Sequence, residues 1–519
     1  MESSAASETT WRVKLSRESA TRALAREVMG FVGANDLVTL TGDLGAGKTT
    51  FARYLIRALL ENDALEVPSP TFTLMQVYEG PKFPIVHADL YRIARPDELV
   101  ELGWDEAADG ALVLVEWVDR AGDRIPPDRL DIKFSLAPEL GEDVRIAEMI
   151  AHGAFKPRLA RAKAIHDLLK STGWANARRA FMLGDASTRA YERLHRGDES
   201  AVLMISPPRP DGPAIRDGLP YSTLAHLAED IRPFIAIGNG LTDLGYSAPR
   251  ILGADIGNGL ALLEDLGGGV VVDDNGPIPE RYMEATAALA DLHRRALPTR
   301  LPLPNGDTYD IPAYDTRAYL IEIELIVDWY ALETPASMHD SVSRIRFLDM
   351  WSRALGQIDA SQTTWTLRDY HSPNLIWLPE RSGLNRVGII DFQDCVIGHP
   401  AYDLASLLQD ARVTVHDDLE LKLLSHYARL RRADDPNFNM ASFARSYALL
   451  GAQRATKILG IFARLDQRDR KPQYLKHIPR IERYLAKNLA HPALAEVREW
   501  FQTHLPHIPA SLDRSEAKA

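Results

Sequence analysis

The stretch that decides the first fold is Gly42-Asp43-Leu44-Gly45-Ala46-Gly47-Lys48-Thr49, between the β-branched run 37–41 and the amphipathic segment 49–60. It fits the pattern G-x-x-x-x-G-K-[ST] in the strand-to-helix context that this pattern requires. In such a loop, glycines let successive backbone N–H groups turn toward phosphate oxygens, and the N-terminus of the next helix attracts negative charge. The alternation of short apolar runs with amphipathic segments up to about residue 143 predicts a parallel sheet covered by helices.

The residues around this loop have the types that nucleotide chemistry needs. Lys48 is predicted to bridge the terminal phosphates of ATP, and Thr49 to offer its hydroxyl to Mg²⁺. Asp89 and Glu116 each end an apolar run, so both are expected at the carboxyl edge of the sheet, as metal ligands or as ordinary solvated loop acids. Thr71 lies where a switch segment would close on the γ-phosphate. The predicted nucleotide-binding residues are Gly42, Asp43, Gly45, Ala46, Gly47, Lys48, Thr49, Thr50 and Thr71.

Length and charge limit the possible functions. The chain has 519 residues, which suits two or three domains at about 100–200 residues each. Its formal net charge is −12, and residues 1–150 carry 16 Lys and Arg against 26 Asp and Glu. This balance argues against a broad basic face that binds nucleic acid by counterion release, although it leaves room for local basic patches, so no direct grip on tRNA is expected.

Cysteine content and hydropathy indicate the cellular compartment in which the protein is expected. The single cysteine, Cys395, excludes an intrachain disulfide and a multi-cysteine zinc site, and we expect it to fill a core. The first ten residues are polar, and no apolar run approaches the ~18–20 residues of a membrane span. We therefore expect a cytoplasmic protein without a membrane segment.

Five short motifs occur in order in the first part: the loop 42–49, then Ser69-Pro70-Thr71-Phe72-Thr73, His87-Ala88-Asp89-Leu90-Tyr91-Arg92, Glu101-Leu102-Gly103 and Val115-Glu116-Trp117. Over about residues 11–140 they resemble the small bacterial ATPase subunit of the tRNA threonylcarbamoyladenosine synthesis complex. The resemblance implies that Thr49, Asp89 and Glu116 serve the metal, and that catalytic Glu116 and nucleotide-binding Trp117 complete the site. It also implies two partners, the threonylcarbamoyltransferase subunit and its paralogous scaffold subunit.

A second domain is expected to follow. The alternation of short apolar runs with amphipathic segments ends near residue 155, where we place the boundary between domains 1–155 and 156–512. The segments 178–183, 191–195 and 201–205 predict three antiparallel strands in a small lobe of about 156–265. Helical periodicity then dominates a larger lobe of about 266–512, with a helix also predicted at 222–234 in the small lobe. The second half is therefore predicted as a two-lobed α+β domain.

The second half also has a catalytic signature. Leu367-Arg368-Asp369-Tyr370-His371-Ser372-Pro373-Asn374 holds Asp-x-x-x-x-Asn, the spacing of a kinase catalytic loop. Asp369 would accept the proton of the substrate hydroxyl, and Asn374 would hold Mg²⁺. Asp391 ends a strand-like run seventeen residues beyond Asn374, where kinases place a metal-binding aspartate. His371 is read equally well as a substrate contact or as packing beneath the loop.

Upstream, the segment 183–191 joins two predicted strands as a phosphate-covering hairpin would. There is no lysine between residues 171 and 420, so the usual phosphate-binding lysine of a kinase strand is absent, with Met204 near its expected place. Arg189 or Arg193 would have to supply that charge, with Glu229 as a candidate partner, because arginine can bind phosphate oxygens bidentately. The predicted nucleotide-binding residues here are Ser187, Arg189 and Arg193.

The order of these segments resembles the aminoglycoside-phosphotransferase-like small-molecule kinases over about residues 160–500. The catalytic segment 369–374, Asp391-Phe392-Gln393-Asp394 and Tyr402-Asp403-Leu404 are most similar to the branch that phosphorylates the anomeric hydroxyl of N-acetylmuramate and N-acetylglucosamine in cell-wall recycling. Leu367 stands where the family has a histidine. The resemblance implies ATP and Mg²⁺ as cofactors and an amino sugar as substrate. Two alternatives stay open for this half: a kinase for an aminoglycoside or choline, and a nucleotide-binding scaffold without phosphotransfer.

Overall fold

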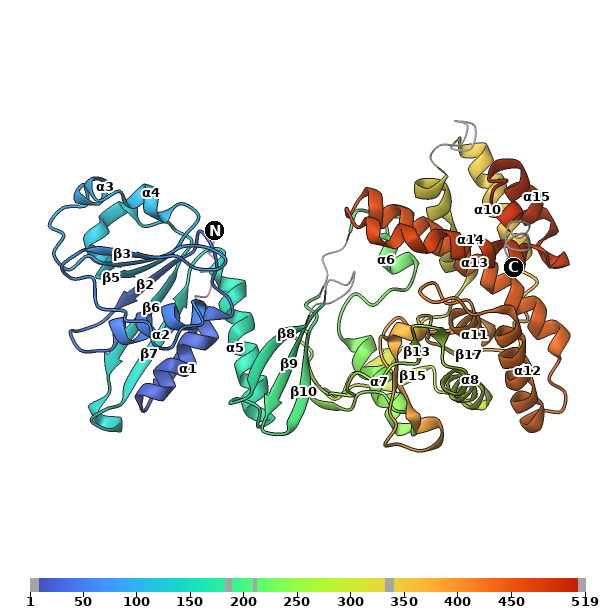
Figure 1. Cartoon of the computed structure of the whole chain (residues 1–519), viewed down its shortest axis with the longest axis horizontal. Helices are drawn as coiled ribbons and strands as arrows, with labels where there is room; N and C mark the ends of the chain where they lie inside the picture. The colour runs from blue at the N-terminus through green and yellow to red at the C-terminus, as the bar shows by residue number, and fades with distance from the viewer. Residues whose placement is uncertain (1–8, 183–188, 209–211, 332–339, 512–519) are drawn as a thin grey trace, which may run out of the picture. The chain divides into compact units, whose positions relative to one another are not determined.

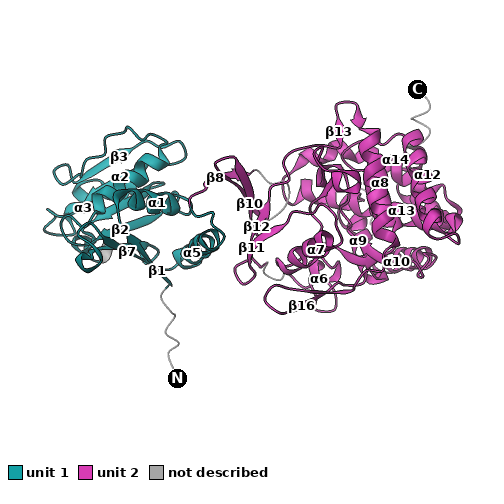
Figure 2. Ribbon diagram, turned by 90° about the horizontal axis from the view of Figure 1, so that it is seen from below, with its two compact units in different colours: residues 1–175 teal, residues 176–519 magenta. Residues whose placement is uncertain are grey.

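The computed structural model describes residues 9–182, 189–208, 212–331 and 340–511. The chain forms two compact units, Met1–Ala175 and Asn176–Ala519, shown in two colours in Figure 2. The predicted boundary at 155/156 coincides with the start of helix α5 (Phe155–Ser171), and the contacts place this helix in unit 1. Its residues Phe155 and Leu159 are buried in the same core as the sheet of unit 1, because the first two turns of α5 pack on that sheet.

Unit 1 is a seven-stranded sheet with helices (Figure 1). The order is β1-β7-β6-β2-β5-β4-β3, in which β6, β2, β5 and β4 run parallel and β1, β7 and β3 pair antiparallel. The predicted parallel sheet is thus confirmed for the central strands only, since the short connection from β6 to β7 forces a hairpin. The elements are β1 (Thr9–Leu15), α1 (Glu18–Met29), β2 (Leu37–Thr41), α2 (Lys48–Leu59), β3 (Met75–Tyr78), β4 (Ile85–Asp89), α3 (Glu98–Glu101), α4 (Trp104–Ala108), β5 (Leu112–Glu116), β6 (Leu130–Leu136) and β7 (Arg145–Ala151).

Unit 2 opens with an antiparallel five-stranded sheet in the order β11-β12-β10-β9-β8. The three predicted strands are confirmed as β8 (Arg178–Met182), β9 (Ala190–Arg196) and β10 (Glu199–Ile205), joined by β11 (Ile251–Asp255) and β12 (Leu260–Glu264). The single helix predicted at 222–234 is wrong: α6 (Tyr221–Leu224) ends early and α7 (Arg232–Asp243) begins later. Pro233 occupies the first turn of α7, a position that suits proline because its missing N–H has no helical partner there.

The remainder of unit 2 is mainly helical, and the catalytic segment 367–374 lies between two of its short strands, β17 and β18. Helix α13 is the longest and runs through the core. No helix in the described part of the chain is long and apolar enough to cross a membrane. The elements are β13 (Val272–Asp273), β14 (Gly276–Pro277), α8 (Pro279–Arg294), β15 (Arg300–Pro302), β16 (Thr308–Asp310), α9 (Thr316–Leu325), α10 (Ser341–Leu355), β17 (Thr364–Thr366), β18 (Leu375–Trp377), β19 (Val387–Ile389), β20 (Val396–Gly398), α11 (Ala401–Leu408), α12 (Asp417–Asp434), α13 (Met440–Gln467), α14 (Ile478–Leu489) and α15 (Ala495–His504).

Candidate functional sites

The loop between β2 and α2 depends on glycine backbone geometry. Gly42 has φ +135°, and a Cβ there would lie 2.2 Å from the carbonyl oxygen of Phe134 on β6. Gly45 (φ +78°) and Gly47 (φ +107°) also adopt conformations that side-chain-bearing residues rarely take. Helix α2 begins immediately afterwards at Lys48. The loop therefore directs backbone N–H groups and a helix N-terminus toward one point, as a phosphate requires.

Lys48 is folded over this loop. Its Nζ donates hydrogen bonds to the carbonyl oxygens of Gly42 (2.8 Å) and Asp43 (3.1 Å). The same ammonium lies 4.5 Å from the centroid of the Trp117 ring, a cation–π contact. Lys48 is only 5% exposed, so its charge is held in place beside the loop before any anion is bound.

The predicted metal-binding side chains meet beside the loop. Glu116 ends β5, which neighbours β2, and its Oε1 accepts a hydrogen bond from the Thr49 hydroxyl at 2.8 Å. Asp89 pairs with Glu116 in the register of β4 and β5, and its Oδ2 accepts a hydrogen bond from Thr71 at 2.6 Å. A cavity of about 360 Å³ opens among these residues; its lining includes Gly45, Gly47, Lys48, Thr49, Thr50, Thr71, Asp89, Glu116 and Trp117. Of the other predicted residues, Gly42 and Asp43 hold Lys48, and Ala46 is buried in the core.

The catalytic segment of unit 2 is fixed by a buried carboxylate. Asp403 on α11 accepts hydrogen bonds from the backbone N–H groups of Leu367 (2.6 Å) and Arg368 (2.8 Å). Arg368 has φ +68°, an unfavourable conformation for a non-glycine residue that persists only when its surroundings hold it. These bonds determine the direction in which the chain presents Asp369.

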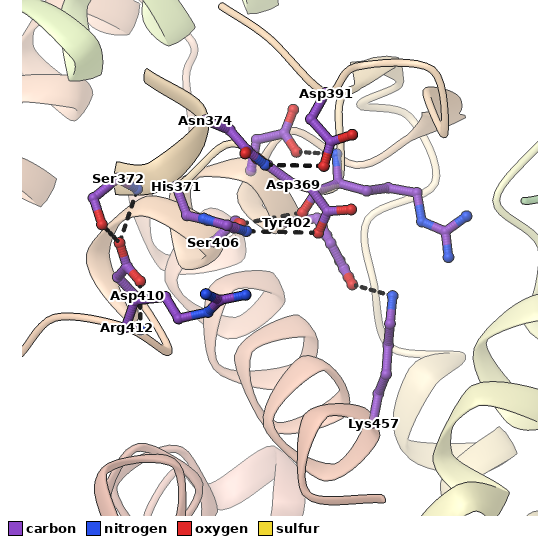
Figure 3. Close-up of polar contacts among 12 residues, drawn as sticks. Asp369, His371, Ser372, Asn374, Asp391, Tyr402, Ser406, Asp410, Arg412 and Lys457 are labelled. Atoms are coloured by element: carbon purple, nitrogen blue, oxygen red, sulfur yellow. Dashed lines mark hydrogen bonds and ion pairs between the residues drawn. The ribbon is translucent and has the colours of Figure 1, made fainter. Parts of the chain in front are cut away.

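Three predicted catalytic and metal-binding residues converge at this point (Figure 3). The Asn374 amide nitrogen donates hydrogen bonds to the Asp369 carbonyl oxygen (2.9 Å) and to Asp391 Oδ2 (3.3 Å). Asp391 Oδ1 accepts a hydrogen bond from Gln393 at 2.8 Å and lies 3.4 Å from Arg189 Nη1. Side chains far apart in the sequence thus form one polar site.

Local charge sets the protonation of both aspartates. Desolvation acts to raise the pKa of Asp369, but the neighbouring basic groups His371, Lys457 and Arg454 outweigh it, so this pKa lies below its ordinary value. Asp369 is therefore an ionised carboxylate that can accept a proton. Desolvation and the charge of Asp369 raise the pKa of Asp391, a like-charge arrangement that a divalent cation would relieve.

Comparisons with known proteins match the two units to different families. Residues 15–143 match the model of the threonylcarbamoyl adenosine biosynthesis protein TsaE, and residues 180–436 match the phosphotransferase enzyme family APH. The chain is 41% identical over 355 residues to an N-acetylmuramate/N-acetylglucosamine kinase of Caulobacter vibrioides, covering 65% of this chain and 95% of that protein. A protein of the same description from Pseudomonas aeruginosa is 30% identical over 64% of this chain and 91% of that protein. The TsaE protein of Rickettsia felis is 36% identical over 27% of this chain and 80% of that protein.

The chain belongs to both families. It is a fusion of a TsaE domain with a phosphotransferase-family kinase domain, as the sequence motifs predicted. The kinase domain makes the chain an ATP-using enzyme.

The nucleotide side of the kinase domain differs in part from the prediction. Arg189 reaches Asp391, whereas Arg193 forms an ion pair with Asp265 (2.8 Å) within the small lobe. Ser187 lies outside the described residues. Met204 is a buried core residue of β10. Glu229 pairs with no arginine among the described residues; its carboxylate accepts hydrogen bonds from the hydroxyls of Ser222 and Thr223 instead.

Sequence reasoning missed residues that hold both sites together. In the TsaE domain, buried His87 places Nε2 3.1 Å from Glu116 Oε1; its place two residues before Asp89 was the available signal. In the kinase domain, fully buried Glu322 forms ion pairs with Arg368 and with Lys457, whose Nζ lies 3.0 Å away. Glu322 and Lys457 come from α9 and α13, and no local motif marks them.

Beside Asp369 lies a cavity of about 210 Å³. Within the described ranges, no group of three or more His, Cys, Asp or Glu side chains is arranged to hold a metal ion. Each site instead offers one or two carboxylates with a hydroxyl or amide, which suits Mg²⁺ shared with nucleotide phosphates. The cavity is lined by Tyr221, Leu227, Glu322, Arg368, Asp369, His371, Asp394, Tyr402, Ala411, Arg412, Arg454, Lys457, Ile458, Ile461, Phe462 and Arg464.

Proposed function

We propose that the kinase domain transfers the γ-phosphoryl group of ATP to the anomeric hydroxyl of N-acetylmuramate or N-acetylglucosamine. The observation that carries this proposal is the convergence of Asp369, Asn374 and Asp391 at the edge of a cavity large enough for part of a sugar. The 41% identity to a kinase of that description supports the choice of acceptor.

The roles follow from the geometry of the site. The ionised Asp369 carboxylate orients the acceptor hydroxyl and takes its proton as the oxygen attacks the γ-phosphorus. Asn374 and Asp391 offer the hard oxygen ligands that suit Mg²⁺, which when bound would bridge the phosphates and neutralise their charge. Arg189 would turn from Asp391 to the phosphate oxygens and supply the charge of the missing lysine.

The cavity argues against a cationic acceptor such as choline or an aminoglycoside. Of its three carboxylates, Glu322 is neutralised by Arg368 and Lys457, and Asp369 is needed for catalysis. The third, Asp394, accepts a hydrogen bond from the backbone N–H of Ala228 at 2.6 Å. Asp394 is therefore the one carboxylate of the described lining that a cationic acceptor could use, and it faces five basic side chains in the same lining.

We infer for the TsaE domain an ATPase that supports formation of threonylcarbamoyladenosine in tRNA. Its partners would be the threonylcarbamoyltransferase subunit and the paralogous scaffold subunit, with ATP hydrolysis resetting the complex between turnovers. Lys48 would contact the β- and γ-phosphates. Thr49, Glu116 and Asp89 would hold Mg²⁺, and Thr71 would close on the γ-phosphate as a switch residue. The contact between the Thr49 hydroxyl and Glu116 carries this assignment.

The kinase proposal is tested by incubating the full chain with Mg²⁺ and labelled ATP, and with N-acetylmuramate, N-acetylglucosamine, an aminoglycoside or choline. Label should appear on the amino sugars, disappear with Asp369→Ala, and persist with the matched surface variant Asp274→Ala. Transfer only to choline or the aminoglycoside would replace the acceptor class. Absence of transfer to all four, with ATP still bound, would support the scaffold alternative.

A further inference from the structure

The cavity beside Asp369 is more basic than the catalytic step requires. Five arginine or lysine side chains line it against three carboxylates. Three of the basic residues, Arg454, Lys457 and Arg464, project from α13 at spacings of three and seven residues, which places them on one face of that helix. Figure 3 shows Lys457 rising from this helix toward Tyr402 and the catalytic aspartates.

The basic residues differ in whether the protein already neutralises them. Arg368 and Lys457 both form ion pairs with Glu322. Arg454 is also buried, with 5% of its surface exposed, yet it has no hydrogen-bond or ion-pair partner among the residues that the structure describes. A buried guanidinium without a hydrogen-bonded or ion-paired acceptor is unfavourable, because it has lost water and gained no partner in exchange. The Arg454 guanidinium therefore lies at the cavity with hydrogen-bond donors that an anion could use.

Two features place the Arg454 guanidinium where the sugar substrate would bind. Its positive charge acts on both Asp369 and His371, so it lies at the catalytic end of the cavity. Arg464 lies ten residues further along α13, about 15 Å at the rise of an α-helix, and its guanidinium stacks 5.2 Å from the Tyr221 ring. A single substrate at Asp369 would thus meet Arg454, while Arg464 lies toward the other end.

We propose that Arg454 binds a carboxylate on the acceptor, so that the kinase domain selects an anionic amino sugar over a neutral one. This inference rests on the proposed function and deepens it. N-acetylmuramate is N-acetylglucosamine with a lactyl ether that ends in a carboxylate, so the two sugars differ in the group that Arg454 would recognise. Arginine suits this role because its planar fork donates two parallel hydrogen bonds to a carboxylate.

The test measures kcat/KM of the full chain for N-acetylmuramate, its uncharged primary amide and N-acetylglucosamine. The wild type should prefer the carboxylate form. Arg454→Gln should lower the ratio of kcat/KM for N-acetylmuramate to kcat/KM for the amide by about 10- to 100-fold. This is the range expected for a hydrogen bond to a charged group. Arg454→Lys should restore part of the preference, since it keeps the charge and loses the fork. Arg445→Gln, on the same helix but outside the cavity lining, is the matched control and should leave the ratio unaltered.

Because both substrates are measured on one preparation, the ratio is independent of the fraction of enzyme that folds. An Arg454→Gln enzyme that keeps the wild-type ratio would overturn the inference, even if its overall activity falls. A wild type that phosphorylates both sugars with no preference for the carboxylate would also overturn it while leaving the proposed function intact. Absence of transfer to every sugar would refute the proposed function itself, which separates the two failures.

Discussion

The two phosphate-handling sites of this chain are built by opposite means. The TsaE domain takes its phosphate-facing groups from the consecutive residues 42–50, where glycine geometry directs backbone N–H groups to one point. The kinase domain gathers the corresponding groups from residues near 189, 369–374 and 391. A contiguous loop makes a site from backbone, whereas a dispersed site depends on side-chain charges that other elements must hold.

The difference extends to how each site stabilises its cation. Lys48 donates to the carbonyl oxygens of its own loop, so no distant element has to supply a counter-charge. Arg368 and Lys457 need Glu322, which comes from another helix. We therefore expect substitutions in the first site to affect chemistry locally, and substitutions in the second to affect chemistry and stability together.

The largest expected effect separates the two activities. Asp369→Ala should lower sugar phosphorylation by about 10²–10⁴-fold or more, because it removes the proposed acceptor of the hydroxyl proton. Lys48→Ala should abolish ATP hydrolysis by the TsaE domain, because it removes the charge that we propose contacts the terminal phosphates. Both are measured on the full chain, the hydrolysis in an Asp369→Ala background so that the kinase domain contributes none.

Each variant is the control for the other. Sugar phosphorylation should survive Lys48→Ala, and sugar-independent ATP hydrolysis should survive Asp369→Ala. A Lys48→Ala chain that hydrolyses ATP at the unchanged rate would refute the assignment of the first site.

The contrast between the sites also explains what the sequence could reveal. Residues 42–49 and the Asp369 to Asn374 spacing are local patterns, so the chemistry of each could be predicted without a structure. Glu322 and Arg454 lie in helical segments that carry no recognisable motif. Only the packing of α9 and α13 against the catalytic segment brings them to the site. Arg193 was predicted on the phosphate side, but the sequence could not show that Asp265 already pairs with it.

The same distinction holds for the fold: local patterns predicted individual elements, but not how distant elements pack together. The strands β8 to β10 follow from alternation, and their predicted positions are confirmed. Helix α5 was assigned to the second domain, because periodicity shows that a helix forms but not which core it joins.

A second prediction concerns the buried charge cluster. Glu322→Gln keeps the size of the side chain but leaves Arg368 and Lys457 without a counter-charge. Removing one member of a buried ion pair costs about 3–5 kcal/mol, so the unfolding transition of unit 2 should fall markedly in calorimetry. Glu496→Gln, which breaks an exposed pair with Arg353, should cost less than about 1 kcal/mol. Equal effects of the two substitutions would contradict the dependence of this site on buried charge.

A third prediction compares two glycines of the loop. Gly42→Ala sets a Cβ against the carbonyl oxygen of Phe134 and strains a φ of +135°, so it should destabilise unit 1 by about 1–3 kcal/mol and weaken nucleotide binding. A Cβ on Gly45 meets no atom of the described chain within 4 Å, so Gly45→Ala should cost about 1–2 kcal/mol, from its positive φ alone. Urea unfolding and nucleotide titration measure both. A larger loss at Gly45 than at Gly42 would show that contact with β6 does not shape the loop.

The smallest effect is a pH dependence of the second site. Desolvation acts to raise the pKa of Glu322, but Lys457 and Arg368 outweigh it and hold the pKa below its ordinary value of 4.5. The folded pKa is therefore lower than the unfolded one, so the stabilisation is complete above about pH 4.5 and is lost as pH falls through the folded pKa. One such proton contributes at most about 1.4 kcal/mol per pH unit.

Urea unfolding of unit 2 at stepped pH tests this sign. The wild type should lose stability below pH 4.5 more steeply than Glu322→Gln, whose amide does not titrate, while the difference between them should be constant from pH 6 to 8. A wild-type advantage that instead shrank as the pH rose from 6 to 8 would mean that Glu322 is protonated in the folded protein. The cluster would then hold two uncompensated cations, and the kinase site would owe its geometry to hydrogen bonds rather than to charge.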